Sequence, residues 1–332
     1  MVRFTNEHLC ELFAEFKKKN IMVIGDIMLD RYVWGRVSRI SPEAPVPVVE
    51  IESESYRFGG AANVAYNVKT LGANVFPIGV IGKDGSGEIL KKFLEENDLP
   101  TDGIIIDKER PTTVKTRVIA HNQHVVRTDR ELRKGISIKV QGQILDLIRL
   151  HLNGVDGIII EDYNKGLLVS RFISDLIELA LSKDKMIFVD PKFDNFFNYQ
   201  KVTLFKPNLK EVADKLGVRI DSDEALNRAG RKLMSRLECK ALMITLGDEG
   251  MILFERDSGE IKIPTHAMKV HDVSGAGDTV IATMAVAMTS GSSLLEAATI
   301  ANHAAGIVCG EVGIKPVDRD QLLRVLKSEG DN

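Results

Sequence analysis

Short apolar runs alternate with amphipathic segments along most of the chain. Residues 6–19 place apolar side chains at helical spacing, whereas Ile21–Ile24 is a continuous apolar run that suits a buried parallel strand. This alternation continues to residue 245 and predicts an α/β fold, with a doubly wound, mostly parallel sheet flanked by helices. The expected helices cover 6–19, 59–71, 88–97, 137–152, 170–181 and 224–236, and the expected strands cover 21–24, 74–81, 103–106, 157–160, 186–189 and 241–245.

Two segments interrupt this rhythm. Residues 33–53 are rich in valine and proline and have no helical period, and residues 112–129 alternate β-branched with polar side chains around a predicted turn at Ala120–Gln123. We expect both segments to form a small β-sheet lid. The chain, 1–332, is then one large domain with a lid made from two excursions.

Composition narrows the function classes. The 332 residues carry 44 basic and 47 acidic side chains, a net charge of −3, which argues against a general nucleic-acid binder. The longest uncharged stretch, Thr279–Leu295, is shorter than the ~20 residues of a membrane helix. The three cysteines are far apart, and no H-E-x-x-H string occurs, so a cysteine or histidine metal site is poorly supported. We expect a cytoplasmic protein with no membrane partner.

The strongest local motif is Asp-Val-Ser-Gly-Ala-Gly-Asp at residues 272–278, followed by a small-residue helical run. Gly275, Ala276 and Gly277 would present backbone N–H groups at a helix start, where an anion such as a phosphoryl group binds favourably. Asp278, a carboxylate with an ordinary pKa near ~4, could accept the proton of an attacking hydroxyl. The alternative is a tight loop with Asp278 as a helix cap.

Three weaker motifs each have a structural alternative. Gly59-Gly60 with Asn63 could let a sugar approach the backbone, or could reflect close helix–sheet packing. Asn208-x-x-Glu211 could hold water around magnesium, or form a capping arrangement. The stretch 245–250 could skirt a nucleotide, or form a hairpin turn into Met251–Phe254. No Walker A loop and no G-x-G-x-x-G occur, so any nucleotide site has another architecture.

Along the chain the motifs follow one another as Gly59-Gly60, Asn208-x-x-Glu211 and Gly-Ala-Gly-Asp at 275–278. Taken together, their order and spacing resemble the ribokinase-like (PfkB) sugar kinases. The strings at 25–32, 38–47, 115–118, 190–192 and 271–281 are similar to one branch, the D-glycero-β-D-manno-heptose 7-phosphate kinases, with departures at His271 and Ser274. The resemblance implies ATP and Mg²⁺. It also implies transfer of phosphate to the anomeric C1 hydroxyl, giving the 1,7-bisphosphate on the route to ADP-heptose and lipopolysaccharide.

Residue roles follow from this resemblance. Asp278 would be the catalytic base, the N–H groups of Gly275, Ala276 and Gly277 would form the anion hole, and Asn208 and Glu211 would hold magnesium through water. The sugar would bind Asp26, Asp30, Gly59, Gly60 and Asn63, with its 7-phosphate on Lys115, Arg117 and Arg127. The nucleotide would contact Lys192, Asn208, Thr245, Gly247, Gly250 and Asn302. Lys192 could equally be a surface lysine, and the three lid cations could be exposed charges.

Partners are also implied. Apolar residues on the lid, such as Val46, Val48 and Val125, would leave exposed edges, so we expect a homodimer that forms through two lids. Many relatives carry a second, cytidylyltransferase-like domain with an H-x-G-H motif, which is missing from this sequence. A separate nucleotidyltransferase is therefore expected. Two other readings stay open: another sugar or sugar-phosphate kinase of the same fold, and a non-catalytic sugar-binding protein.

Overall fold

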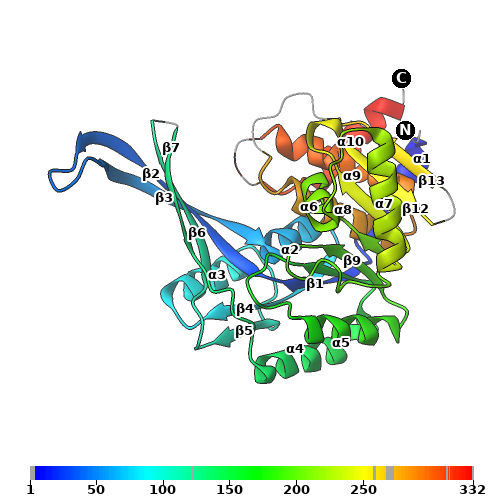
Figure 1. Ribbon diagram of the computed structural model, residues 1–332, viewed down its shortest axis with the longest axis horizontal. Coiled ribbons are helices and arrows are strands. Elements are labelled where there is room, and N and C mark those ends of the chain that lie inside the picture. The colour runs from blue at the N-terminus through cyan, green and yellow to red at the C-terminus, as the bar shows by residue number, and fades with distance from the viewer. Residues whose placement is uncertain are drawn as a thin grey trace.

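The computed structural model describes residues 4–121, 123–256, 259–266, 273–311, 313 and 315–330. Across these residues the chain forms a nine-stranded main sheet and a four-stranded second sheet (Figure 1). Pairing in the main sheet is parallel from β5 to β11 and antiparallel between β11, β12 and β13. In spatial order its strands are β13 (Gly259–Ile263), β12 (Met251–Glu255), β11 (Ala241–Thr245), β10 (Leu204–Phe205), β9 (Met186–Asp190), β8 (Gly157–Glu161), β1 (Asn20–Gly25), β4 (Asn74–Gly82) and β5 (Ile104–Asp107).

Helices cover both faces of the main sheet. In β1, Ile21 and Val23 enter one apolar core and Met22 and Ile24 enter the other, as the two-residue period of a strand requires. This explains why the strand is apolar throughout. The first core contains buried residues of α1 (Asn6–Phe16), α2 (Ala61–Thr70), α3 (Gly85–Glu96), α8 (Ala276–Thr289), α9 (Leu294–Cys309) and α10 (Arg319–Gly330). The second contains those of α4 (Ile138–His151), α5 (Ser170–Leu181), α6 (Leu209–Leu216) and α7 (Asp223–Leu237).

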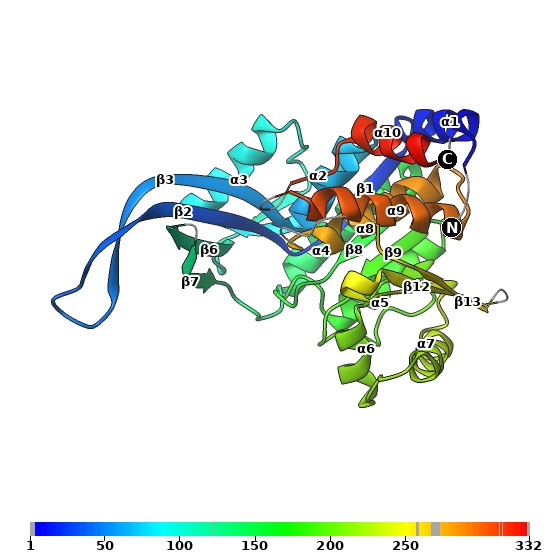
Figure 2. The same ribbon diagram turned by 90° about the horizontal axis from the view of Figure 1, so that it is seen from above.

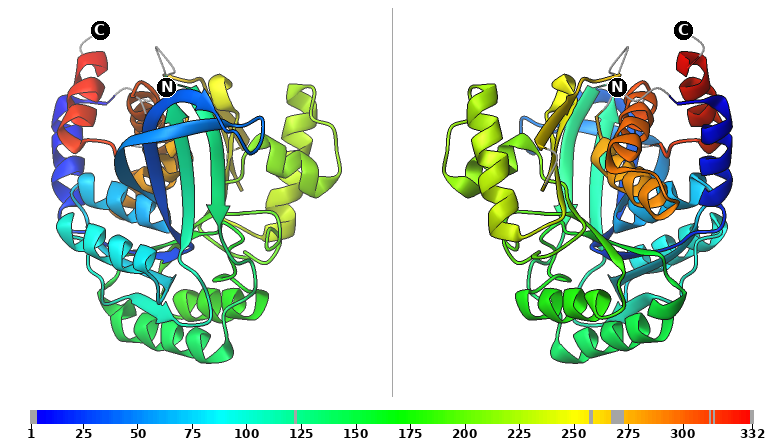
Figure 3. Two further views of the ribbon diagram at one scale, coloured as in Figure 1. Left: turned by 90° about the vertical axis from the view of Figure 1, so that its left-hand side faces the viewer. Right: turned by 90° about the vertical axis from the view of Figure 1, so that its right-hand side faces the viewer.

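The second sheet is the predicted lid, and its β2–β3 hairpin projects away from the body (Figures 1 and 2). Seen from the lid side in Figure 3, its strands cross in front of the main sheet. Its order is β3 (Pro47–Gly60), β2 (Ile27–Ile40), β6 (Thr113–Ala120) and β7 (Gln123–Arg130). The strands therefore extend beyond the predicted segments 33–53 and 112–129. The base of β2 is buried, so its local pattern resembles that of a body strand.

The predicted α/β class, with a parallel sheet and a small lid sheet, is confirmed. The predicted start of helix 59–71 is wrong. Gly59 and Gly60 are the last residues of β3 and pair with Met28 and Ile27, and α2 begins at Ala61. A Cβ at position 59 would lie 2.4 Å from Oδ2 of Asp30, so only glycine permits this approach. In the described part of the chain, no helix is both long and apolar enough to cross a membrane.

Candidate active site

Asp278 lies in the first turn of α8 and is 5% exposed. The N-cap of α8 is Gly275, in the left-handed conformation, so the reading of Asp278 as a cap is wrong. Two side chains from distant segments hold the carboxylate instead. Asn63 of α2 donates from Nδ2 to Oδ2 at 2.7 Å, and the Tyr163 hydroxyl donates to Oδ1 at 3.1 Å. Each carboxylate oxygen is therefore fixed by one donor.

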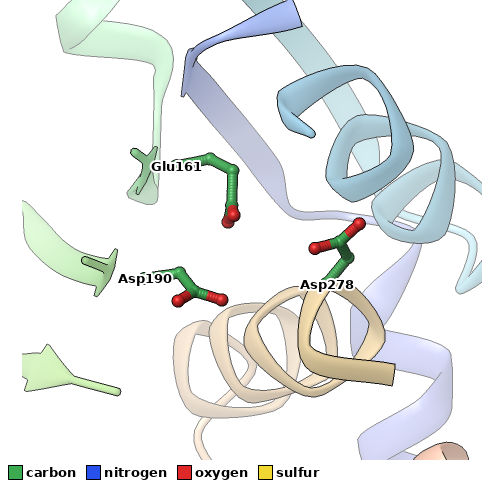
Figure 4. Close-up of side chains that lie close together, drawn as sticks. All are labelled: Glu161, Asp190 and Asp278. Carbon is green, nitrogen blue, oxygen red and sulfur yellow. The ribbon is translucent and has the colours of Figure 1, made fainter. Parts of the chain in front are cut away.

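Two further carboxylates converge with Asp278, as Figure 4 shows. Glu161 ends β8 and Asp190 ends β9, and ligand oxygens of the three residues all lie within 4.8 Å of one another. Both side-chain oxygens of Glu161 are buried and have no hydrogen-bond partner within the described residues. Asp190 is paired with Nζ of the buried Lys206 at 2.6 Å. The edge of the sheet thus concentrates negative charge opposite the start of α8.

This environment changes the acidity of the cluster. Burial raises the pKa of Asp278 to about 6, although the hydrogen bond from Asn63 opposes that rise and the charge of Asp190 adds to it. Burial, with the charges of Asp190 and Asp278, raises the pKa of Glu161 well above its usual range. Asp278 is consequently a stronger base than an ordinary carboxylate, and most of it is still ionised at pH 7.

The cluster fits a divalent cation. Mg²⁺ and Ca²⁺ bind carboxylate oxygens, and unpartnered buried oxygens such as those of Glu161 are costly without a positive partner. The predicted magnesium residues lie close by, but their structure matches the capping alternative. Asn208 caps α6 by accepting from the Glu211 N–H at 2.8 Å, and Oε2 of Glu211 accepts from the Asn208 N–H at 2.8 Å. Magnesium binding through water at Asn208 and Glu211 stays a prediction.

Lys192 is joined to this cluster. Its Nζ lies 3.1 Å from Oε1 of Glu211 and 3.7 Å from Oδ1 of Asp190. Burial disfavours its charged form, but the charges of Asp190, Glu211 and Glu161 outweigh that effect and raise the pKa of Lys192. The Lys192 ammonium therefore stays positive beside the carboxylates, and its side chain is 29% exposed. The geometry favours a site lysine over an isolated surface lysine.

A cavity of about 220 Å³ opens beside the start of α8. It brings together four of the predicted nucleotide residues with part of the predicted anion hole: Thr245, Gly247, Gly250, Asn302, Ala276 and Gly277. Lys192 and Asn208 do not line this cavity. Asn208 lies next to it, because its backbone forms an isolated β-bridge with Thr245, which does line the cavity. The turn at 245–250 also leads into β12, so the hairpin alternative is present too. A larger cavity, about 450 Å³, lies between α7 and β12–β13 and shares none of these residues.

The start of α8 faces a buried cation. A Cβ on Gly277 would lie 3.4 Å from Nζ of Lys206 and 3.7 Å from Oδ2 of Asp190. The Ala276 N–H donates to the carbonyl of Val273 at 3.3 Å, so one predicted anion-hole donor has a backbone partner. The motif residues 271 and 272 lie outside the described residues. The anion hole remains a prediction, placed beside a lysine that the sequence analysis did not assign.

The predicted sugar residues lie where the lid joins the body. Asp30 on β2 is buried and forms an ion pair with Arg117 of β6. Asp26 is also buried, and its oxygens accept the backbone N–H groups of Tyr163, Lys165 and Leu167 at 2.9, 3.0 and 3.3 Å. Asp26 therefore fixes the loop after β8. Gly59 and Gly60 lie beside these two aspartates, since their added Cβ atoms would meet Asp30 and the Asp26 carbonyl.

The predicted phosphate-binding cations lie on one face of the lid. Asp30 and Lys115 are paired across β2 and β6, and Arg117 and Arg127 are paired across β6 and β7. Directly paired positions share a face of a sheet, as do residues two apart on one strand. Nζ of Lys115 lies 5.0 Å from the centre of the Tyr163 ring. Arg117 and Arg127 already have acidic partners on the same face, Asp30 and Asp129.

Sequence reasoning assigned no role to four residues at the centre of this site: Glu161, Tyr163, Asp190 and Lys206. A signal was available for Glu161, Asp190 and Lys206, because each lies at the end of a main-sheet strand. Glu161 is the first charged residue after the buried run of β8, and Lys206 directly follows β10. The carboxyl ends of parallel strands meet at one sheet edge, where α/β proteins bind their ligands. Polar residues at those ends were therefore candidates.

Comparisons with known proteins identify the family of this chain. The model of the "pfkB family carbohydrate kinase" matches residues 18–319. The chain belongs to the pfkB family of carbohydrate kinases. This pfkB protein is 41% identical over 323 residues to the "Bifunctional protein HldE" of Geobacter sulfurreducens, and 40% identical over 309 residues to that of Helicobacter pylori. The matches cover 96% and 93% of this chain, and 66% of each relative, so the chain spans slightly less than two thirds of their length.

Solved structures share the fold at low sequence identity. A ribokinase from Arabidopsis thaliana, solved with ribose and ATP, aligns with a TM-score of 0.75 and 19% identity, covering 93% of this chain and 99% of that one. Phosphofructokinase-2 from Escherichia coli, solved with potassium, aligns with a TM-score of 0.77 and 16% identity, covering 95% and 99%. The predicted ribokinase-like fold and carbohydrate kinase family are confirmed.

Replacing Asp278 with asparagine should stabilise the protein at neutral pH. The pKa of Asp278 is raised from 3.8 to about 6, so ionisation costs the folded state up to roughly 3 kcal/mol once the pH exceeds 6. That cost is absent below pH 4. We therefore expect Asp278→Asn to be about 1–3 kcal/mol more stable than the wild type at pH 8 in urea denaturation, and equally stable at pH 4.

The control is Asp175→Asn on the exposed face of α5, which should change stability by no more than about 0.5 kcal/mol at either pH. An Asp278→Asn protein that is less stable than the wild type at pH 8 would contradict the prediction.

Proposed function

We propose that this pfkB protein transfers phosphate from ATP to the C1 hydroxyl of D-glycero-β-D-manno-heptose 7-phosphate, giving the 1,7-bisphosphate, in the cytoplasm. The observation that carries the proposal is the position of Asp278. It is buried and doubly hydrogen-bonded, beside the cavity that contains the predicted nucleotide residues. The resemblance to heptose 7-phosphate kinases and the similarity to HldE proteins support the choice of sugar.

In the proposed reaction, Asp278 accepts the proton of the sugar C1 hydroxyl. The C1 oxygen forms a bond to the γ-phosphorus, and the bond from that phosphorus to the bridging oxygen of ADP breaks. The backbone N–H groups of Gly275 and Gly277 and the α8 dipole stabilise the charge on the transferring group, and the Ala276 N–H joins them once it leaves the Val273 carbonyl. Lys206 and Lys192 add positive charge at the same edge of the site. Asn63 and Tyr163 hold the base in place.

The metal in this proposal is Mg²⁺, which neutralises phosphate charge when bound. Asn208 and Glu211 would hold it through water, and the carboxylates of Glu161 and Asp190 offer further oxygen ligands nearby. The ion pair of Glu211 with Lys192 keeps an anion and a cation together beside the carboxylate cluster.

Sugar recognition in this proposal combines hydroxyl and phosphate contacts. Asp30, Asn63 and the backbone at Gly59–Gly60 would bind sugar hydroxyls. Lys115, Arg117 and Arg127 would bind the 7-phosphate, since their shared lid face can meet a dianion with several donors. Lys115 is the lid cation best suited to bind the phosphate, because it forms no ion pair within the described residues. Its burial lowers its pKa, and a bound phosphate would stabilise its charged form. A phosphate would supply the missing charge.

The lid also offers a surface for a second copy of the chain. Exposed apolar side chains gather on it, with Ile40 61% exposed, Val46 51%, Ile51 59% and Val126 48%, while Val48 and Val125 are half-buried. β3 and β7 are the edge strands of the lid sheet. Exposed apolar edges favour association, so we propose a homodimer that pairs two lids.

Lys115→Met should separate the heptose phosphate from other sugars. Removing one charge-assisted contact is expected to raise KM for the heptose 7-phosphate about 10–100-fold and to leave KM for ATP within about threefold. The measurement is steady-state ADP release with the 7-phosphate and, in parallel, with the unphosphorylated heptose. Lys139→Met, at an exposed position of α4, is the control. Equal effects on both sugars would favour another carbohydrate kinase of this family.

Glu211→Gln tests the magnesium role against the capping role. Glutamine can still cap α6, so stability should change little, whereas the Mg²⁺ concentration for half-maximal rate should rise about 10-fold. Glu296→Gln is a matched control, because Glu296 forms the same capping box with Ser293 at the start of α9. If the two variants show the same Mg²⁺ dependence, Glu211 is only a capping residue.

The lid dimer predicts a mass of two chains in light scattering at micromolar concentration. Ile51→Asp places a charge in the proposed interface and should give a monomer. Ile138→Asp is the control, since Ile138 is 85% exposed on α4 rather than on the lid. A wild-type protein that scatters as a monomer, or an Ile51→Asp protein that stays dimeric, would rule out pairing through this surface.

A further inference from the structure

Tyr163 occupies a central position that no motif pointed to. It follows β8 in the loop at residues 162–169, and its side chain is half-buried. Its hydroxyl donates to Oδ1 of Asp278, while the ammonium groups of two lysines lie over its ring. Nζ of Lys115, on the lid, is 5.0 Å from the ring centre, and Nζ of Lys192 is 5.1 Å from it. One side chain therefore interacts with Asp278, with Lys115 of the lid and with Lys192 beside the carboxylate cluster.

The loop that carries Tyr163 is held firmly. Asp26 accepts three of its backbone N–H groups, including that of Tyr163 itself. Arg110 donates to the carbonyl of Lys165, and Nζ of Lys165 pairs with Glu131 at 2.6 Å, just beyond β7. Contacts to the body and to the end of the lid thus fix the backbone at Tyr163. A rigid backbone is what a residue needs if it is to orient another side chain within a few tenths of an ångström.

We propose that Tyr163 is the positioning residue for the catalytic base, and that its ring also aligns Lys115 and Lys192 toward the two phosphate-bearing substrates. The inference rests on the proposed role of Asp278 as the base. Oδ2 of Asp278 is held by Asn63, so the Tyr163 hydroxyl determines the rotation of the carboxylate about its last bond. The proton-accepting lone pair can then face the sugar hydroxyl instead of Glu161 or Asp190.

The surroundings keep the phenol in its donating form. Burial, with the charges of Asp278, Glu161 and Asp190, raises the pKa of Tyr163 well above its usual range, so the hydroxyl is protonated at physiological pH. Groups that face Asp278 from other elements are Glu161 of β8, Asp190 of β9 and Lys206 after β10, and within the described residues none of them is hydrogen-bonded to the Tyr163 hydroxyl. The phenol contributes orientation rather than charge.

The chain offers a matched control for this hydrogen bond. The Tyr199 hydroxyl donates to Oδ2 of Asp162 at 2.6 Å, and that pair is buried within the same half of the protein. Tyr199→Phe removes a phenol-to-aspartate hydrogen bond of the same kind without touching Asp278. A general loosening of the loop would therefore affect both variants, whereas loss of positioning affects only one.

The experiment is a double-mutant cycle in the full chain, with heptose 7-phosphate and ATP as substrates. Tyr163→Phe should lower kcat about 10–100-fold and leave both KM values within about threefold, because the ring remains. In the Asp278→Asn background, the same change should lower the residual kcat by no more than about twofold, since there is no base left to orient. Tyr163→Leu should additionally raise both KM values, and Tyr199→Phe should leave kcat within about threefold.

Three results would overturn the inference: a Tyr163→Phe enzyme with more than half the wild-type kcat, equal kcat losses in Tyr163→Phe and Tyr199→Phe, or multiplicative losses in the cycle. An Asp278→Asn enzyme with normal turnover is a different outcome, because it removes the proposed base itself. Melting temperatures of all variants show whether each one is folded.

Discussion

The burial of three acidic side chains at one edge of the sheet is the constraint on which this structure depends. Glu161, Asp190 and Asp278 bring three carboxylates within 4.8 Å, and isolated buried charges cost several kcal/mol each. The fold offsets that cost with Lys206 on Asp190, with the amide and phenol donors on Asp278, and with the α8 dipole. The strands β8 and β9 end at this cluster, and β10 ends one residue before Lys206. Helix α2 contributes Asn63 and helix α8 contributes Asp278.

Much of the fold was accessible from the sequence because β strands and helices have different periods. β1, β8 and β9 are buried on both faces and appear as apolar runs, while the helices show one apolar stripe each. Failures occurred where tertiary contacts decided the outcome. Gly59 and Gly60 read as a helix start, yet pairing with β2 makes them the end of β3. The base of the lid was missed because it is buried like the body.

The sequence predicted those site residues that belong to one contiguous motif. It did not predict residues that the fold brings together from distant segments. Asp278 and Gly275 stand within four residues, so their relation was visible in the chain. Glu161 and Tyr163 come close to Asp278 only in the folded protein, where β8 pairs with β1 and α8 packs near the end of β8. The motif of Asn208 and Glu211 was found in the sequence, but its role was not decided there. The sequence allowed a helix cap or a magnesium site, and the structure shows the cap, so the magnesium role needs an experiment.

Asp278 and its hydrogen-bond partner Asn63 lie far apart in the sequence, and this separation has a consequence for biosynthesis. Asn63 and Asp278 are 215 positions apart, and β1 pairs with β8 from the middle of the chain. During translation, the lid strands, β1 and α2 leave the ribosome well before α8. A nascent chain therefore contains Asn63 long before its partner Asp278 is made, so this hydrogen bond forms only after the last third of the protein has folded onto the first.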